Sequence, residues 1–329
     1  MITDTLRPPP PFDPSAVAYK DWLHVHLFHE PSGCIGIFNA SLHGSPGDPR
    51  ARAIGTALVH SPVAGWVGNV EVAALEDANV GATSIALERI ALGTDAAHGT
   101  VLVSAQLPAD GLEAGITAVT RARPVDIERR LPFGSGWISW YIVPRLAVTG
   151  GLAIDGQRID LSGASAYHDH NWGRWHWGDD VGWEWGTACA AGLTIVVSRA
   201  TDRAHRTATG ILLVVDAGGE RRTFSTAVTV QLEGRLTART RRLPGALAAL
   251  HQDRISPALP ARIVVRAYDG VDSVELVFTA RAAAQLIAGD PARRGYGFLH
   301  QLVGTFAARC RIAGRTHEAT GLAGFEYVD

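Results

Sequence analysis

Short hydrophobic segments recur along the whole chain and are separated by residues that favour turns. Valine, isoleucine, threonine and aromatic residues dominate the segments, and pairs such as Asp155-Gly156 and Gly218-Gly219 punctuate them. This pattern is typical of antiparallel β-strands joined by tight turns. The predicted strands span residues 34–42, 68–75, 84–92, 100–107, 115–121, 193–199, 210–216, 222–232, 262–268, 273–280 and 307–317.

Helical patterns are few. Residues 244–251 and 282–288 are rich in alanine and leucine and predict short helices, whereas residues 297–306 fit either state. The fold class is therefore all-β, with few short helices.

The strands fall into two sets, each able to close into a barrel or sandwich. We expect an extended lead-in over residues 1–18, one β domain over 19–149 and a second over 150–329, packed together as two β-barrels. The predicted boundary lies at Gly150 and Gly151.

The composition of the chain limits the classes of partner that we expect it to bind. The 329 residues carry a formal net charge of −2, which offers no basic field for nucleic acid and no polybasic segment for anionic lipid. Lys20 is the only lysine, a bias that we attribute to genome composition. We expect the protein to bind a hydrophobic small molecule and no nucleic acid. The sequence does not specify the oligomeric state, and it leaves open a transient contact with a membrane during substrate loading.

The cysteines Cys34, Cys189 and Cys310 are odd in number and far apart, which predicts buried free thiols and neither a disulfide framework nor a cysteine zinc site. The first residues lack the pattern of a secretory signal, and no stretch is apolar for long enough to span a bilayer. We therefore expect a cytoplasmic protein.

The most informative stretch combines aromatic and titratable residues. If residues 167–172 form a strand, their side chains alternate between two faces. One face would carry a phenol, a carboxyl and an amide, from Tyr167, Asp169 and Asn171. The other would carry two imidazoles and an indole, from His168, His170 and Trp172. Only one of these faces can line a given cavity.

Further tryptophans follow at once. Trp175 and Trp177 alternate with polar residues, and Trp183 and Trp185 flank Glu184, a spacing that predicts two strands joined by a turn at residues 178–180. Such a hairpin would place four indoles on one wall of a pocket, and ordinary core packing is the alternative.

Asp169 is the candidate acid. A carboxyl surrounded by indoles stays protonated near neutral pH because burial disfavours its charged form, and it can then donate a proton to a double bond or carbonyl. Tyr167, on the same face, could relay that proton, and Glu184 is a second candidate carboxyl. The alternative is that Asp169 is a surface residue or a turn cap.

Metal binding is a competing use of the histidines. His168 with His170, and His24 with His26 near His29, each place two imidazoles on one strand face, but neither pair has a third ligand fixed by the sequence. We predict no metal site. No nucleotide-binding glycine loop and no nucleophilic serine motif is present either, so a mechanism without cofactors is the simplest expectation.

The run AYHDHNWGRW, followed by GWEWG, TIVVSR and the ending GLAGFEYVD, resembles the two-domain lipocalin-like superfamily of carotenoid 1,2-hydratase (hydroxyneurosporene synthase), which also includes Diels-Alderase-type cyclases. The resemblance implies two calycin-type β-barrels with a pocket near their interface for an elongated apolar substrate. It also implies that a Tyr-x-Asp pair, here Tyr167 and Asp169, protonates a terminal double bond. The His-x-Trp element of the hydratases has no counterpart, since residues 136–141 supply indoles but no histidine.

Three hypotheses follow. The first is an enzyme that protonates an isoprenoid or other polyene at Asp169, helped by Tyr167 and a neighbouring histidine, His168 or His170. The cation would then meet water or an internal alkene. The second is a pericyclase acting by orientation, and the third is a carrier of a hydrophobic ligand. The residues expected to bind substrate and stabilise positive charge are Trp137, Trp140, Asn171, Trp172, Trp175, Trp177, Trp183 and Trp185.

Overall fold

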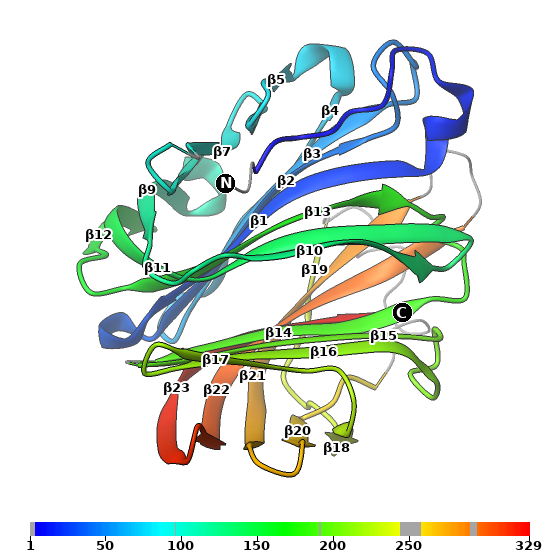
Figure 1. Cartoon of the computed structure of the whole chain (residues 1–329). Coiled ribbons are helices and arrows are strands. Elements are labelled where there is room, and N and C mark those ends of the chain that lie inside the picture. Colours follow the sequence, from blue (N-terminus) through cyan, green and yellow to red (C-terminus); the bar gives the residue numbers. More distant parts are fainter. Residues whose placement is uncertain (1–3, 96, 191, 244–257, 290–294) are drawn as a thin grey trace. The chain divides into compact units, whose positions relative to one another are not determined.

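The chain folds almost entirely into β-strands, as expected from the sequence (Figure 1). This computed structural model describes residues 4–95, 97–190, 192–243, 258–289 and 295–329. Within these residues the only helices are single 3₁₀ turns, at Pro14–Ala18, Glu30–Ser32, Leu75–Asp77 and Pro108–Asp110. None of the helices in the described part of the chain is long and apolar enough to cross a membrane.

The chain divides into two compact units. Unit 1 comprises Met1–Asp179 with Ala288–Tyr296, and unit 2 comprises Asp180–Ile287 with Gly297–Asp329. Each unit is built on one sheet with its own hydrophobic core. The predicted all-β class is therefore confirmed, and the two β-barrels expected from the sequence correspond to two mainly antiparallel sheets.

The sheet of unit 1 has thirteen strands in the order β4-β3-β2-β1-β13-β11-β9-β8-β7-β6-β5, with β10 and β12 both paired to β11. Consecutive strands pair as hairpins in most of the sheet, but β13 returns to lie between β1 and β11. The strands are β1 Tyr19–His29, β2 Cys34–His43, β3 Arg52–Ser61, β4 Gly65–Ala74, β5 Asn79–Val80, β6 Ser84–Ala86, β7 Ile90–Asp95, β8 Thr100–Leu107, β9 Leu112–Thr120, β10 Val125–Phe133, β11 Gly136–Ile154, β12 Gln157–Asp160 and β13 Ser165–Arg174.

The sheet of unit 2 has ten strands in the order β17-β16-β15-β14-β23-β22-β21-β20-β18, and β19 pairs in parallel with β21. Its core includes Phe278 and Phe325, whose ring centroids lie 4.7 Å apart. The strands are β14 Gly182–Ala190, β15 Leu193–Thr201, β16 Ala208–Ala217, β17 Glu220–Phe224, β18 Val228–Glu233, β19 Arg241–Leu243, β20 Arg262–Tyr268, β21 Ser273–Gly289, β22 Tyr296–Ile312 and β23 Arg315–Val328.

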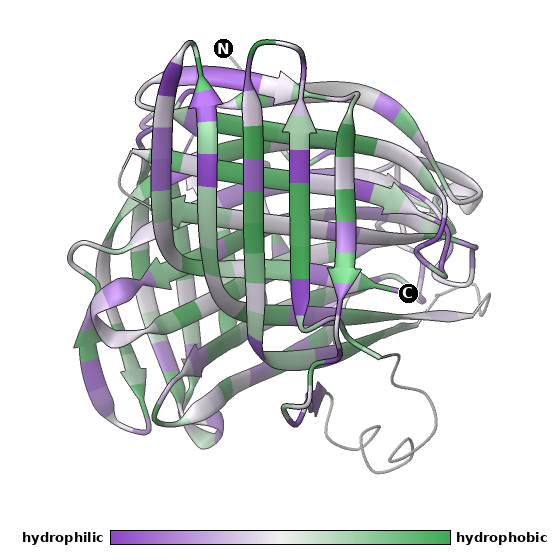
Figure 2. Ribbon diagram, turned by 90° about the horizontal axis from the view of Figure 1, so that it is seen from below, coloured by the Kyte–Doolittle hydropathy of each residue, from purple (hydrophilic) through white to green (hydrophobic). Residues whose placement is uncertain are grey.

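Period-two patterning explains the outer strands. In β8, Val101 and Val103 are buried in the core while Leu102 and Ser104 are exposed, and Figure 2 shows apolar and polar residues alternating in this way along many strands. β1 and β13 differ, because almost every residue of both strands is buried, whichever face it occupies. Polar residues on these two strands are therefore removed from water on both faces of the sheet.

The structure corrects three expectations. The predicted boundary at Gly150 and Gly151 falls inside β11. Glycine is needed at position 150 for close packing of the strands and not for a break between domains, because a Cβ atom there would lie 2.1 Å from the Gly115 carbonyl oxygen. The alanine-rich residues 282–288 belong to β21, where sheet pairing overrides helix propensity. The predicted strand 307–317 is a hairpin that turns at Ala313 and Gly314, both with positive φ.

Residues 297–306, which fitted either state, form part of β22. The predicted helix at residues 244–251 lies outside the described residues. The cysteines Cys34, Cys189 and Cys310 are buried and free, as predicted.

Candidate functional site

The polar run of residues 167–172 is a central strand, as predicted. It forms the middle of β13, which pairs with β1 on one side and β11 on the other. Directly opposite residues of antiparallel strands share a face, with their Cβ atoms about 4.5–5.5 Å apart. The register therefore determines which side chains of the three strands lie together.

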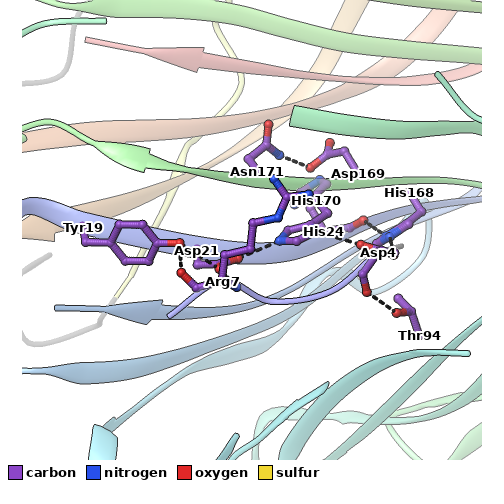
Figure 3. Close-up of polar contacts among 10 residues, drawn as sticks. All are labelled: Asp4, Arg7, Tyr19, Asp21, His24, Thr94, His168, Asp169, His170 and Asn171. Atoms are coloured by element: carbon purple, nitrogen blue, oxygen red, sulfur yellow. Dashed lines mark hydrogen bonds and ion pairs between the residues drawn. The ribbon is translucent and has the colours of Figure 1, made fainter. Parts of the chain in front are cut away.

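One face carries Asp169, and we call it the Asp169 face. Its members come from all three strands and are Trp22, His24, His26, Trp140, Tyr167, Asp169 and Asn171. Asp169 stands opposite His24 on β1 and Ile142 on β11, and its side chain is almost completely buried. Asn171 donates a hydrogen bond from Nδ2 to Asp169 Oδ1, which fixes the orientation of the carboxyl group (Figure 3).

Two histidines complete this face. The rings of His24 and His26 meet edge to face with centroids 4.6 Å apart, and His26 lies 6.2 Å from the ring of Tyr167. Burial, reinforced by the nearby His168, lowers the pKa of His24 to about 3, so this imidazole is neutral. An amide nitrogen only donates, so Asn39 Nδ2, 3.5 Å from His24 Nδ1, leaves the ring proton on Nε2.

The opposite face of β13 belongs to the hydrophobic core of unit 1, and we call it the core face. His168 and His170 point to this side and contact the carboxylate of Asp4, through Nε2 at 2.7 Å and Nδ1 at 2.8 Å respectively. His170 Nε2 also lies 2.7 Å from Asp21 Oδ1. Figure 3 shows Asp169 and Asn171 on one side of the strand and these ion pairs on the other.

The ion pairs shift the titration of both partners. Burial alone would lower the pKa of His170, but the hydrogen bonds that its ring donates to the carboxylates of Asp21 and Asp4 outweigh burial and raise that pKa to about 9. Burial alone would raise the pKa of Asp4, but His168 and His170 bring it well below its ordinary value. His170 is thus cationic and Asp4 anionic at neutral pH. Their position corrects the prediction that His168 or His170 relays a proton to Asp169, since both face away from it.

The amino-terminal segment is anchored on the core face. Arg7 donates its backbone N–H to Asp21 Oδ2 at 2.7 Å, and the Tyr19 hydroxyl donates to the Arg7 carbonyl. The guanidinium of Arg7 lies 3.9 Å from the ring centroid of Trp172. Trp172 is therefore a partner of Arg7 on the core face, and it does not share the Asp169 face as a substrate-binding indole.

The other predicted indoles of unit 1 divide in the same way. Trp140 stands opposite Asn171 on the Asp169 face, whereas Trp137 packs against the core beneath Arg130. Trp175 packs edge to face against Trp22, with centroids 5.5 Å apart, and so extends the aromatic surface of the Asp169 face.

Lys20 lies at the end of this aromatic surface. Its ammonium group donates to the carbonyl of Trp175 and lies 4.5 Å and 5.3 Å from the ring centroids of Trp175 and Trp177. The side chain is fully buried, so the single lysine of the chain has a specific structural position. The attribution to genome composition did not anticipate this position.

The predicted tryptophan hairpin is wrong. Residues 175–178 leave the sheet after β13, and β14 pairs with β15 and β23 in the sheet of unit 2. Trp183 donates its indole N–H to Glu326 Oε2 at 3.1 Å, and Trp185 is buried on the same strand face. Glu184 points to the other face of β14, where it contacts Arg199 and His205 of its own unit.

Sequence reasoning missed Trp22, His24 and His26 as site residues. Their alternation along β1 was visible, but nothing in the sequence indicated that β1 pairs with β13 across almost the full length of both strands. No group of three or more histidine, cysteine, aspartate or glutamate residues within the described part of the chain is arranged to hold a metal ion.

The fold is shared with solved proteins. A candidate AttH from Nitrosomonas europaea has a TM-score of 0.68 and 15% identity, over 94% of this chain and 92% of that one. Kievitone hydratase from Nectria haematococca has a TM-score of 0.62 and 13% identity, over 95% of this chain and 90% of that one. CghA has a TM-score of 0.63 and 13% identity, over 94% of this chain and 88% of that one.

Sequence comparison is less informative, because no family model and no curated protein matches the chain. The structural likeness extends over nearly the whole chain at low identity. The all-β fold of this protein is therefore that of the candidate AttH, kievitone hydratase and CghA, as the resemblance of its sequence implied.

Proposed function

We propose that this protein is a cofactor-independent enzyme that protonates a double bond of a hydrophobic polyene or isoprenoid-derived metabolite. The observation that supports this proposal is the Asp169 face, where one oriented carboxyl group is buried among a phenol, two imidazoles and two indoles. A buried acid beside aromatic rings is suited to alkene protonation, because the acid supplies the proton and the rings stabilise the resulting cation.

In this mechanism Asp169 transfers its carboxyl proton to one alkene carbon, and the other carbon becomes a tertiary cation. Asn171 orients this carboxyl group by donating its amide N–H to Oδ1. If water attacks the cation, its oxygen forms the new C–O bond and the released proton returns to Asp169, with Tyr167 or His26 as the relay. If an internal alkene attacks instead, a ring forms and the loss of a proton regenerates the acid.

The indoles of Trp22 and Trp140 flank Asn171 from β1 and β11, so both lie beside the acid in the register of the sheet. A cation over the face of an indole is stabilised by about 0.5–2 kcal/mol, the larger value applying when water is excluded. Hydration and cyclisation therefore use the same acid and the same rings, and differ only in the nucleophile that reaches the cation.

A pericyclic reaction is the second candidate, and a specific observation favours it. His24 is neutral, carries its proton on Nε2, and has no hydrogen-bond partner for that atom among the described residues. A neutral N–H of this kind can polarise a carbonyl group of a bound polyene without transferring a proton.

Isotope labelling distinguishes these reactions. Candidate linear polyenes are incubated with the wild type, Asp169→Asn and the exposed-site control Asp77→Asn, in D₂O or in water enriched in ¹⁸O, and products are analysed by mass spectrometry. Deuterium on carbon with ¹⁸O in the product indicates hydration, and deuterium alone indicates cyclisation by protonation. Asp169→Asn should lower turnover by about 10²–10⁴-fold, as expected for loss of a general acid.

Two outcomes contradict the proposal. An isomerised product without either label, formed equally well by Asp169→Asn, indicates the pericyclic reaction. Ligand recovered unchanged after binding to the wild type indicates a carrier of a hydrophobic molecule.

A further inference from the structure

Unit 2 contains an open cleft of about 580 Å³, and none of the residues that line it takes part in the proposed reaction. The cleft lies where β20 turns into β21 and β22 turns into β23, at one end of the sheet (Figure 1). These four strands are neighbours in the order β23-β22-β21-β20. A volume of this size is typical of sites for small molecules.

Arg311 carries the open charge of the cleft. The preceding residue, Cys310, points into the hydrophobic core of unit 2, so Arg311 lies on the opposite, exposed face of β22. Arg311 stands opposite Thr316 of β23, which has no charge, and both residues line the cleft. Among the described residues the guanidinium has no ion pair and no hydrogen bond. Because arginine stays cationic, the cleft holds a positive charge that no carboxylate of the described chain neutralises at close range.

The other charged side chains of the cleft are already paired. Arg266 lies 2.9 Å from Glu275, and Arg309 lies 3.2 Å from Glu318. Both pairs join residues that stand directly opposite each other on neighbouring strands. Only Arg311 is therefore open to a charged ligand among the lining residues.

The register of the strands brings three side chains into one line. Gly304 of β22 packs against the backbone of Ala280 of β21, and counting seven residues along each antiparallel strand from this contact brings Arg311 opposite Ser273. Ser273 in turn stands opposite Tyr268 of β20. Arg311 and Tyr268 are therefore two strand spacings apart, about 9–10 Å, with the hydroxyl group of Ser273 between them.

Tyr268 gives the cleft an aromatic wall. The residue is 59% exposed, yet its hydroxyl group donates to the Gly270 carbonyl at 2.9 Å, which holds the ring across the turn. The turn is itself held by Asp269, whose carboxylate accepts the backbone N–H groups of Val271 and Asp272. An exposed ring in a fixed position is suited to packing against an aromatic ligand.

We infer that this cleft is a second ligand site, which binds a small aromatic carboxylate. The carboxylate accepts two parallel N–H bonds from the guanidinium of Arg311, and Ser273 donates its hydroxyl group to the nearer oxygen. The aromatic ring of the ligand extends from there to Tyr268, a distance that one carboxylate and one ring can bridge. One open guanidinium matches one negative charge, so the cleft suits a carboxylate better than a phosphate dianion.

The test compares benzoate with benzamide, which has nearly the same shape and no charge. Binding to the full-length protein in low-salt buffer is followed through the ¹⁵N signal of the Arg311 Nε–H group, assigned by its loss in Arg311→Gln. Benzoate should shift this signal and bind at least about fivefold more tightly than benzamide, because only benzoate makes charge-assisted hydrogen bonds.

Variants at exposed positions locate the site without disturbing the core. Arg311→Gln should weaken benzoate binding by about fivefold and leave benzamide binding unchanged. Tyr268→Leu should weaken the binding of both ligands, because both lose the same ring contact. Arg315→Gln is the matched control, because Arg315 is an exposed arginine of the same hairpin that stands opposite Ile312 and does not line the cleft.

The inference is overturned if the wild type binds benzoate and benzamide equally, or if benzoate leaves the Arg311 signal unmoved up to its solubility limit. Benzoate binding that is undiminished in Arg311→Gln, or that falls equally in Arg315→Gln, would overturn it as well. Phenyl phosphate that binds more than about tenfold more tightly than benzoate would refute the carboxylate as the ligand class. None of these residues belongs to the Asp169 face, so this inference and the proposed function can fail separately.

Discussion

The ion pairs on the core face make Asp4→Asn the most informative stability variant. Asp4 bonds to His168 and His170 at 2.7 Å and 2.8 Å, and all three side chains are at most 7% exposed. Replacing the carboxylate by an amide removes the negative charge that both rings share. Breaking a buried pair by removing one partner costs about 3–5 kcal/mol, and we expect the free energy of unfolding to fall by this amount at pH 7.

The pH dependence of the free energy of unfolding gives a second quantity that can be measured. The pKa of His170 rises from its ordinary 6.5 to about 9 on folding. At about 1.4 kcal/mol per pKa unit, this difference corresponds to a stabilisation of about 3 kcal/mol. A raised histidine pKa stabilises the fold fully below pH 6.5, and the stabilisation is lost as the pH rises through 9. Wild-type stability should therefore decline between these two values, and that of Asp4→Asn should decline less.

Urea denaturation at pH 6.5, 7.5 and 9 measures both effects, with hydrogen exchange of the β1 and β13 amides to report on unit 1 separately. Asp48→Asn is the matched control, because Asp48 pairs at 2.8 Å with Arg50, whose side chain is 56% exposed, and loss of this pair should cost less than about 1 kcal/mol. Wild-type stability that does not change between pH 6.5 and 9, or an Asp4→Asn variant as stable as the wild type, would refute the reasoning.

Two further predictions concern packing and burial. Gly186→Ala should destabilise unit 2 by about 1–3 kcal/mol, because its Cβ would lie 2.2 Å from the Phe325 ring, whereas Gly210→Ala has no atom within 4 Å and should change little; thermal unfolding of the pair decides. The three cysteines should resist iodoacetamide in the native protein and react fully in urea, because all are buried and burial raises the pKa of Cys310 to about 12. Mass spectrometry that finds a native cysteine alkylated at pH 8 would contradict this.

Local patterns predicted the strands well, because alternation and turn residues are properties of short segments. The strand at residues 167–172 and its two faces were predicted correctly from alternation alone. The partners of that strand were not. His24 and His26 reach the Asp169 face only because β13 pairs with a strand more than a hundred residues earlier, and Asp4 reaches His168 from the other end of the unit.

The tryptophan hairpin failed for a related reason. Residues 172–185 have the spacing of two paired strands, but alternation does not specify which strand is the partner. β13 pairs with β1 and β11, whereas β14 pairs with β15 and β23, so neighbouring segments of the sequence belong to different sheets. The interior partners of the carboxylates were equally hidden: nothing local distinguishes Asp4 from a surface carboxylate, and the tryptophans beside Glu184 did not indicate that it contacts Arg199 and His205.

The ion pairs of the core face also determine what happens on the opposite face. Side chains alternate along β13, so a slip of one residue against β1 would turn Asp169 into the core and His168 towards the acid's present position. Such a slip would leave Asp4 and Asp21 without their histidine partners in an apolar interior, at a cost of several kcal/mol. His168 and His170 therefore fix the register of β13, so that polar contacts inside the core of unit 1 determine which side chains lie on the Asp169 face.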